Sequence, residues 1–177
     1  MKIWKSLLAK KLVCPAYRPA RADPSRMEVF RAMHEQIRLE YRIKMKSLGW
    51  QLLDSGVPIE NSLFKGRIDD LFTNGSKVLV VEYVSSLFPR ADKLYDTALS
   101  TAFLRFENGV DAEGAVFSRE EITQVPNFLI DQTWKMVKSL PKLLNLNNEG
   151  LLEFANPESG LCSYCDNGQC KRNPENH

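Results

Sequence analysis

The four cysteines of this 177-residue chain are unevenly spaced, and their spacing constrains the fold more than any other feature. Cys162, Cys165 and Cys170 form a CxxCx4C cluster near the end of the chain, whereas Cys14 stands alone near its start. Because Gly and Asp residues interrupt the cluster, no helix or strand would turn all three thiols into a core. Such a group is typical of a metal or iron–sulfur site that takes its fourth ligand from elsewhere, and Cys14 is the only cysteine left to supply it. One cofactor would then join the two ends of the chain.

Three kinds of site can use four cysteines in this arrangement. Spacing alone favours an iron–sulfur cluster and a structural Zn²⁺ about equally, because CxxC is a common half of a zinc site. Two disulfides are less expected, since the opening MKIWKSLLAKKLV lacks the cleavage site of a signal peptide. No apolar stretch approaches the ~20 residues needed to cross a bilayer. We therefore expect a cytoplasmic protein without a membrane segment.

The charge is distributed unevenly along the chain. Residues 1–50 hold 12 Lys or Arg against 4 Asp or Glu, a net charge of +8, and the remainder carries −6. A basic first third suggests a polyanionic partner, most plausibly nucleic acid, although a solvated helix face would explain the same charges. A guanidinium group can bind phosphate through two parallel hydrogen bonds. The expected DNA-backbone contacts are therefore Arg18, Arg21, Arg26, Arg31, Arg38 and Arg42.

The hydrophobic periodicity predicts a mixed α/β domain with a small central sheet flanked by helices. Ser25 is expected to cap the first helix, in a capping box with Glu28, and Pro141 to end the last one. One structural domain is expected, with an N-terminal segment (1–24), a core (25–150) and a cysteine-rich end (151–177) whose last residues, 171–177, form a frayed tail. Helices are predicted at 25–48, 93–106 and 127–140, and strands at 64–72, 77–83 and 115–117.

Two acidic residues come together if the predicted strands at 64–72 and 77–83 form a tight hairpin. Asn74-Gly75 is the strongest two-residue hairpin signal, and the register that follows puts Asp69 opposite Val80 and diagonal to Glu82. Such diagonal neighbours have β-carbons roughly 7–8 Å apart, within reach of one cation, whereas Asp70 points the other way.

Carboxylate oxygens of this kind suit Mg²⁺ or Mn²⁺, and a cation there could polarise a phosphodiester and activate water. The alternative is that Asp69 and Glu82 are solvated charges near a turn and a strand end. His34, on the first predicted helix, is either a third metal ligand or an ordinary boundary residue.

Five short motifs occur in a specific order from Cys14 to Cys170: Cys14-Pro15, Met33-His34-Glu35, Gly66-Arg67-Ile68-Asp69, Val81-Glu82-Tyr83 and the CxxCx4C cluster. In this order the chain resembles the CRISPR-associated RecB-like exonucleases, which are iron–sulfur members of the PD-(D/E)xK nuclease superfamily. The resemblance implies a restriction-endonuclease-like core whose termini are joined by the cluster.

The resemblance also implies specific ligands and an activity. A 4Fe–4S cluster would be held by Cys14, Cys162, Cys165 and Cys170, which shifts the balance from zinc towards iron–sulfur. Mn²⁺ or Mg²⁺ would be held by His34, Asp69 and Glu82. Members of this family act as exonucleases on single-stranded DNA ends and trim DNA for the CRISPR integrase complex during spacer acquisition. Related copies occur in viruses and mobile elements.

One motif departs from the family pattern. The expected Glu-x-Lys reads Glu82-Tyr83-Val84, so the lysine that would steady negative charge in the transition state is missing. Either Lys93, on the following helix, supplies the charge, or the protein is a catalytically impaired member that binds DNA or a partner. Thr97 stands nearest to the place of the family's helical tyrosine.

Overall fold

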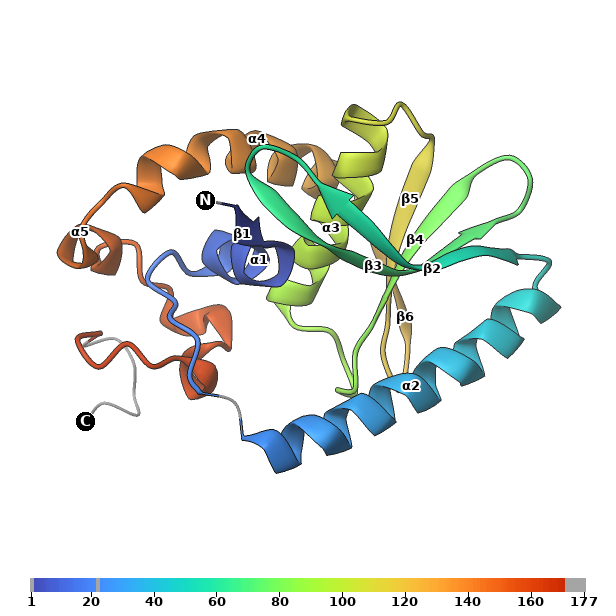
Figure 1. Cartoon of the computed structure of the whole chain (residues 1–177), viewed down its shortest axis with the longest axis horizontal. Helices are drawn as coiled ribbons and strands as arrows, with labels where there is room; N and C mark the ends of the chain where they lie inside the picture. Colours follow the sequence, from blue (N-terminus) through green and yellow to red (C-terminus); the bar gives the residue numbers. More distant parts are fainter. Residues whose placement is uncertain (1, 22, 171–177) are drawn as a thin grey trace.

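A six-stranded mixed sheet occupies the middle of the molecule, in the strand order β1-β3-β4-β5-β6 with β2 also paired to β3 (Figure 1). The computed structural model describes residues 2–21 and 23–170, so the predicted tail at 171–177 lies outside the described residues. The β1–β3 and β4–β5 pairs are parallel and the other pairs are antiparallel. The strands are β1 (Ile3–Trp4), β2 (Gln51–Glu60), β3 (Phe64–Thr73), β4 (Val78–Tyr83), β5 (Ala112–Phe117) and β6 (Ile122–Val125).

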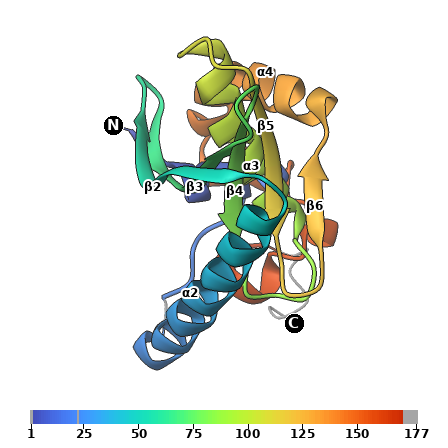
Figure 2. The ribbon, with the colours of Figure 1, turned by 90° about the vertical axis from the view of Figure 1, so that its right-hand side faces the viewer.

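Helices cover the sheet on both sides, as the periodicity predicts. The helices are α1 (Lys5–Val13), α2 (Pro24–Ser47), α3 (Ala91–Phe106), α4 (Asn127–Leu144) and α5 (Asn148–Leu152), followed by two 3₁₀ turns at Pro157–Ser159 and Cys162–Tyr164. The first, third and fourth helices pack together, and one core cluster joins Leu8 of α1, Val80 of β4 and Leu99 of α3. The long helix α2 runs past the other side of the sheet (Figure 2), where Ile37 and Tyr41 pack against Phe117.

The predicted helices and strands are confirmed, but two helix ends are wrong. Asp23, rather than Ser25, caps α2: its carboxylate accepts a hydrogen bond of 3.0 Å from the Ser25 amide, and Pro24 fills the first helical position. Helix α4 continues past Pro141 to Leu144. The burial of Val137 and Leu140 in the core holds this segment helical despite the hydrogen bond that proline cannot donate.

The predicted two-residue hairpin is also wrong. Thr73 pairs with Val78, so residues 74–77 form the connection between β3 and β4. The Asn74 side chain accepts hydrogen bonds from the amides of Ser76 and Lys77, which stabilises this longer turn. The register therefore moves by two residues. Because Asp70 pairs with Val81, Asp69 stands across from Glu82 itself.

The opening segment forms elements that the sequence analysis did not predict. Strand β1 pairs with β3 through Phe64 and Lys65, and the chain then turns directly into α1. Strand β2 follows the whole of β3 along its other edge, and β4 pairs with Asp70–Thr73. Within the part of the chain that the structure describes, no strand pairs with Gly66–Asp69 on the edge between β1 and β4. Backbone and side chains at this open edge are free to line a pocket.

Among residues 2–21 and 23–170, the structure contains no helix with both the length and the apolar character needed to cross a membrane.

Candidate active site and cysteine site

A pocket of about 230 Å³ lies at the open edge of β3. It is lined from four directions: the β1–α1 junction, α2, the β3–β4 pair and the start of α3. Three of the predicted site residues, His34, Asp69 and Glu82, share this pocket, as does Lys93. The remaining lining residues are Trp4, Lys5, Ser6, Gly66, Arg67, Tyr83 and Asp96.

The side chain of Asp69 is held in place by groups from helix α2 and strand β4. Its Oδ2 lies 3.1 Å from His34 Nε2 and accepts a hydrogen bond of 3.0 Å from the Tyr83 amide. Burial raises the pKa of Asp69, but the bonds from His34 and from the Tyr83 amide outweigh burial and hold the pKa below its ordinary value. Asp69 is therefore an anionic ligand or base at neutral pH.

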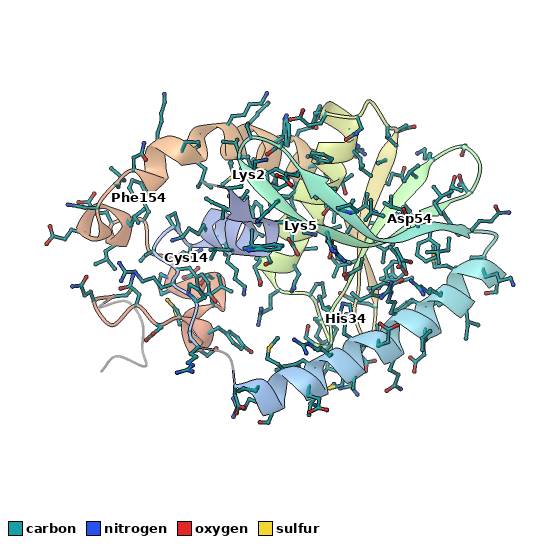
Figure 3. All side chains as sticks on the ribbon, in the orientation of Figure 1. Lys2, Lys5, Cys14, His34, Asp54 and Phe154 are labelled. Carbon is teal, nitrogen blue, oxygen red and sulfur yellow. The ribbon has the colours of Figure 1, made fainter. Side chains whose placement is uncertain are left out.

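Glu82 is buried and faces a lysine that the sequence analysis did not consider. The Lys5 ammonium contacts Glu82 Oε1, and it also hydrogen-bonds Ser100 Oγ at 2.9 Å. Burial lowers the pKa of Lys5, but the carboxylates of Asp96 and Glu82 outweigh that effect and raise it. Burial also raises the pKa of Glu82 well above its ordinary value, against the opposing effect of the Lys5 ammonium. Figure 3 shows Lys5 at the start of α1, beside the sheet.

Asp96 adds a third carboxylate that sequence reasoning also missed. It is buried on α3, its Oδ1 lies 3.6 Å from Lys5 Nζ, and that oxygen has no hydrogen-bond partner among the described residues. The burial of Lys5 had a signal in the sequence. Lys5 lies on the same helical stripe as Leu8 and Leu12, and charged residues on an apolar stripe are rarely buried without a partner.

The chemistry of this pocket suits a divalent cation. Among the described residues, no group of three or more His, Cys, Asp or Glu side chains is arranged to hold a metal ion. The donor types nevertheless fit, since carboxylate oxygens and an imidazole suit Mg²⁺ and Mn²⁺. Asp69, Glu82 and Asp96 line the pocket together with Lys5, Arg67 and Lys93, and the Asp96 oxygen lacks a hydrogen-bond donor within the described chain. The pocket therefore contains an unsatisfied oxygen that a cation would compensate.

Val84 and Lys93 lie in different surroundings. Val84 is only 4% exposed and packs in an apolar cluster with Ala98, Ala102 and Val116, among others. Lys93 lines the pocket from the first turn of α3, half-buried. In the described part of the chain, no hydrogen bond or ion pair joins Lys93 to Asp69 or Glu82.

Replacing Val84 by lysine is expected to destabilise the protein rather than complete its site. The longer side chain must enter a filled apolar cluster, which costs about 2 kcal/mol by overpacking and lowers the melting temperature by about 4–8 °C. Thermal unfolding of Val84→Lys and Val84→Met separates charge from volume, because methionine is similar in length but uncharged. A Val84→Lys protein as stable as wild type would contradict this prediction.

Asp70 points away from the pocket, as predicted, and binds two of the arginines expected to contact DNA. Its side chain is 0% exposed, and Arg42 donates to it twice, both at 2.7 Å. Arg38 lies 3.2 Å from the same carboxylate. Both guanidinium groups are thus already engaged. The other predicted DNA contacts, all exposed, are Arg18, Arg21, Arg26 and Arg31.

The four cysteines surround one small pocket at the other end of α1. Cys14 follows α1 directly, and it lines this pocket together with Cys162, Cys165 and Cys170 (the residue is labelled in Figure 3). Cys14 and Cys170 are buried, and Cys162 and Cys165 are partly buried. Apolar residues of both chain ends, including Ala16, Tyr17 and Leu161, enclose them.

The donor set of this second pocket fits an iron–sulfur cluster or a thiolate-bound zinc. Backbone amides point at two of the sulfurs: Asn156 N lies 3.4 Å from Cys14 Sγ, and Arg18 N lies 3.4 Å from Cys165 Sγ. Hydrogen bonds to sulfur favour the thiolate form that binds metal and tune the potential of a cluster. A bridge between Pro19 and Cys165 also ties the two chain ends together.

The similarity of this chain to known proteins is weak. No protein family matches the chain, and no curated protein matches it significantly. A solved structure from Eubacterium rectale, described as a "putative exonuclease", is similar at 20% identity and a TM-score of 0.39 over 82% of this chain. The chain spans 59% of the length of that structure.

Proposed function

We propose that this protein is a metal-dependent DNA exonuclease that acts on single-stranded ends. The observation that supports it is the convergence of His34, Asp69 and Glu82 on one pocket at the open edge of β3. These residues come from elements far apart in the sequence. Bound Mn²⁺ or Mg²⁺ would polarise the scissile phosphodiester and lower the pKa of a water molecule. His34, Asp69 and Glu82 would hold the ion.

The chain's own groups prepare the pocket for this chemistry. The Tyr83 amide and His34 fix Asp69, and Lys5 with Ser100 fixes Glu82. Trp4 is 58% exposed at the rim, where an indole can stack on a base of single-stranded DNA. Arg67 is exposed beside it and offers a phosphate contact.

The cysteine site would hold a 4Fe–4S cluster that secures both ends of the chain. The resemblance to the CRISPR-associated RecB-like exonucleases and the restriction-endonuclease-like core that it implies favour this cofactor over zinc. The same resemblance suggests that the protein trims DNA beside a CRISPR integrase complex in the cytoplasm. Brown colour and equal amounts of iron and sulfide in anaerobically purified protein would support the cluster, whereas colourless protein with one equivalent of zinc would exclude it.

Asp69→Asn is expected to abolish cleavage. An end-labelled single-stranded oligonucleotide incubated with Mn²⁺ should be shortened stepwise by wild type, and the variant should be at least about 100-fold slower because an anionic ligand is lost. Asp54→Asn, an exposed aspartate on β2, is the matched control and should cleave as wild type does. If the oligonucleotide stays equally intact with wild type and with Asp69→Asn, the proposed activity is refuted.

A second function is favoured by Val84 and by the pairing of Glu82 with Lys5. The protein would then bind DNA without cutting it, using the exposed arginines of its basic first third. Binding should weaken steeply as salt rises, because phosphate contacts release counterions. Salt-dependent binding with no shortening of the oligonucleotide in Mn²⁺ would establish this alternative.

A further inference from the structure

The pocket contains one lysine that is held against a carboxylate of the predicted metal site. We propose that Lys5, from the first residue of α1, supplies the positive charge that the Glu-x-Val sequence of β4 lacks. This inference rests on the proposed nuclease function and names a catalytic residue within it. The charge would come from the opening segment of the chain rather than from β4 or from Lys93.

The fold brings Lys5 to the pocket through a short strand pairing. Strand β1 pairs with the beginning of β3, Trp4 opposite Lys65, so the next residue emerges beside Gly66. A β-carbon on Gly66 would lie 2.6 Å from Lys5 Cβ, which is closer than real side chains approach. Glycine at this position thus permits the contact. The Gly66-Arg67-Ile68-Asp69 motif therefore accommodates Lys5 as well as carrying Asp69.

The surroundings of Lys5 favour a role in the chemistry over a role in stability. The residue is 4% exposed and lies on the apolar stripe of α1, where leucine or methionine would pack at no electrostatic cost. A buried ion pair is often no more stabilising than apolar residues of the same size. Retaining an ammonium here, in contact with Glu82 and Ser100, therefore calls for another reason.

That reason is the charge that develops in hydrolysis. A water oxygen forms a new bond to phosphorus while the bond from phosphorus to the leaving oxygen breaks. Water gives its proton to solvent, and the leaving oxygen takes a proton from solvent, so the products are a phosphomonoester and an alcohol. While these bonds form and break, negative charge accumulates on the phosphoryl oxygens, and a fixed ammonium stabilises that charge.

Lys5→Met tests the inference, because methionine keeps the length of the side chain without its charge. With an end-labelled single-stranded oligonucleotide and saturating Mn²⁺, kcat should fall about 10²–10³-fold with little change in KM, as when one transition-state donor is removed. Binding of Mn²⁺, measured as the rise in melting temperature that the ion produces, should persist. Lys5→Arg should retain more activity than Lys5→Met.

Three further variants control for position and folding. Lys77→Met removes another lysine that is paired with a glutamate: Lys77 lies in the β3–β4 turn and pairs with Glu113 of β5, so this variant should cleave as wild type does. Lys93→Met tests whether Lys93, rather than Lys5, supplies the positive charge in the pocket. Gly66→Ala displaces Lys5 without altering any charge and should slow cleavage at least about 10-fold. If Lys5→Met fails to fold, the cleavage rate of Gly66→Ala tests the role of Lys5 in its place.

Several outcomes would overturn the inference. Wild-type kcat in folded Lys5→Met, or in folded Gly66→Ala, would do so and leave the nuclease function standing. Loss of cleavage in Lys93→Met, but not in Lys5→Met, would assign the charge to Lys93. If Lys5→Met binds Mn²⁺ and wild type does not, the ammonium replaces the metal and the inference fails. If wild type cleaves nothing, the proposed function fails and this inference falls with it.

Discussion

Asp70→Ala is expected to lower the melting temperature by about 6–12 °C. Removing one partner of a buried ion pair costs about 3–5 kcal/mol, because the remaining charge loses its partner without regaining water. The lower end applies here, since the side chains of Arg38 and Arg42 are 21% and 25% exposed and recover part of their hydration. About 3 kcal/mol corresponds to this shift for a chain of this size.

The size of the effect follows from how much Asp70 holds together. Its two oxygens accept hydrogen bonds from Arg38 and Arg42 of α2, from Ser55 of β2 and from the Tyr83 hydroxyl at 2.8 Å. The carboxylate thus joins the long helix to three strands. The same groups position Tyr83, whose amide holds Asp69.

Thermal unfolding measures this prediction, and an exposed ion pair provides the control. The side chains of Lys77 and Glu113 are 46% and 36% exposed, so Glu113→Ala should cost no more than about 1 kcal/mol. Equal melting temperatures for Asp70→Ala and Glu113→Ala would show that the buried pair does not stabilise the fold.

The contribution of Asp70 should also depend on pH in a defined direction. Burial raises the pKa of Asp70, but hydrogen bonds from Arg42, Tyr83 and Ser55 outweigh burial and hold the pKa below the ordinary value of 3.8. Because the folded-state pKa is depressed, the stabilisation is complete above the pKa of the unfolded chain and is lost as pH falls through the folded-state pKa. The difference in stability between wild type and Asp70→Asn should therefore be constant near neutrality and shrink below pH 3.8. A difference that grows in acid would contradict the assignment.

Cys14→Ala and Cys170→Ala are each expected to lower the melting temperature by about 10 °C or more. If one cluster binds both thiols, it closes a loop that contains nearly the whole chain. By analogy with a disulfide of that span, the closure contributes about 4–5 kcal/mol through the unfolded state. Both cysteines are 8% exposed, so the two alanine variants lose comparable packing.

Removing iron separates the cofactor from packing. A chelator should lower the melting temperature of wild type to that of the two variants and leave the variants unchanged. Cleavage should fall as well, since Cys14 follows α1 directly and Lys5 begins the same helix. Unequal losses in the two variants, or a wild type indifferent to the chelator, would show that the four thiols do not hold one cluster.

The sequence by itself determined the elements with strong periodicity. The apolar stripes of α2, α3 and α4 and the apolar runs of β3 and β4 set the type and approximate bounds of these segments. The order of the motifs also pointed to His34, Asp69 and Glu82, and the structure brings these three to one pocket. Local patterns suffice here because each residue's neighbours along the chain decide its helix or strand face.

Only the tertiary structure decided which charges meet. Asn74 accepts bonds from two amides and lengthens the turn, which moves the strand register and places Asp69 across from Glu82. Lys5 reaches Glu82, 77 residues away in sequence, because a two-residue strand pairs with β3 and Gly66 leaves room for it. The meeting of Cys14 with the cysteines at the other end of the chain depends on the same packing of α1. Such contacts are set by non-local pairing and packing, which no window of neighbouring residues encodes.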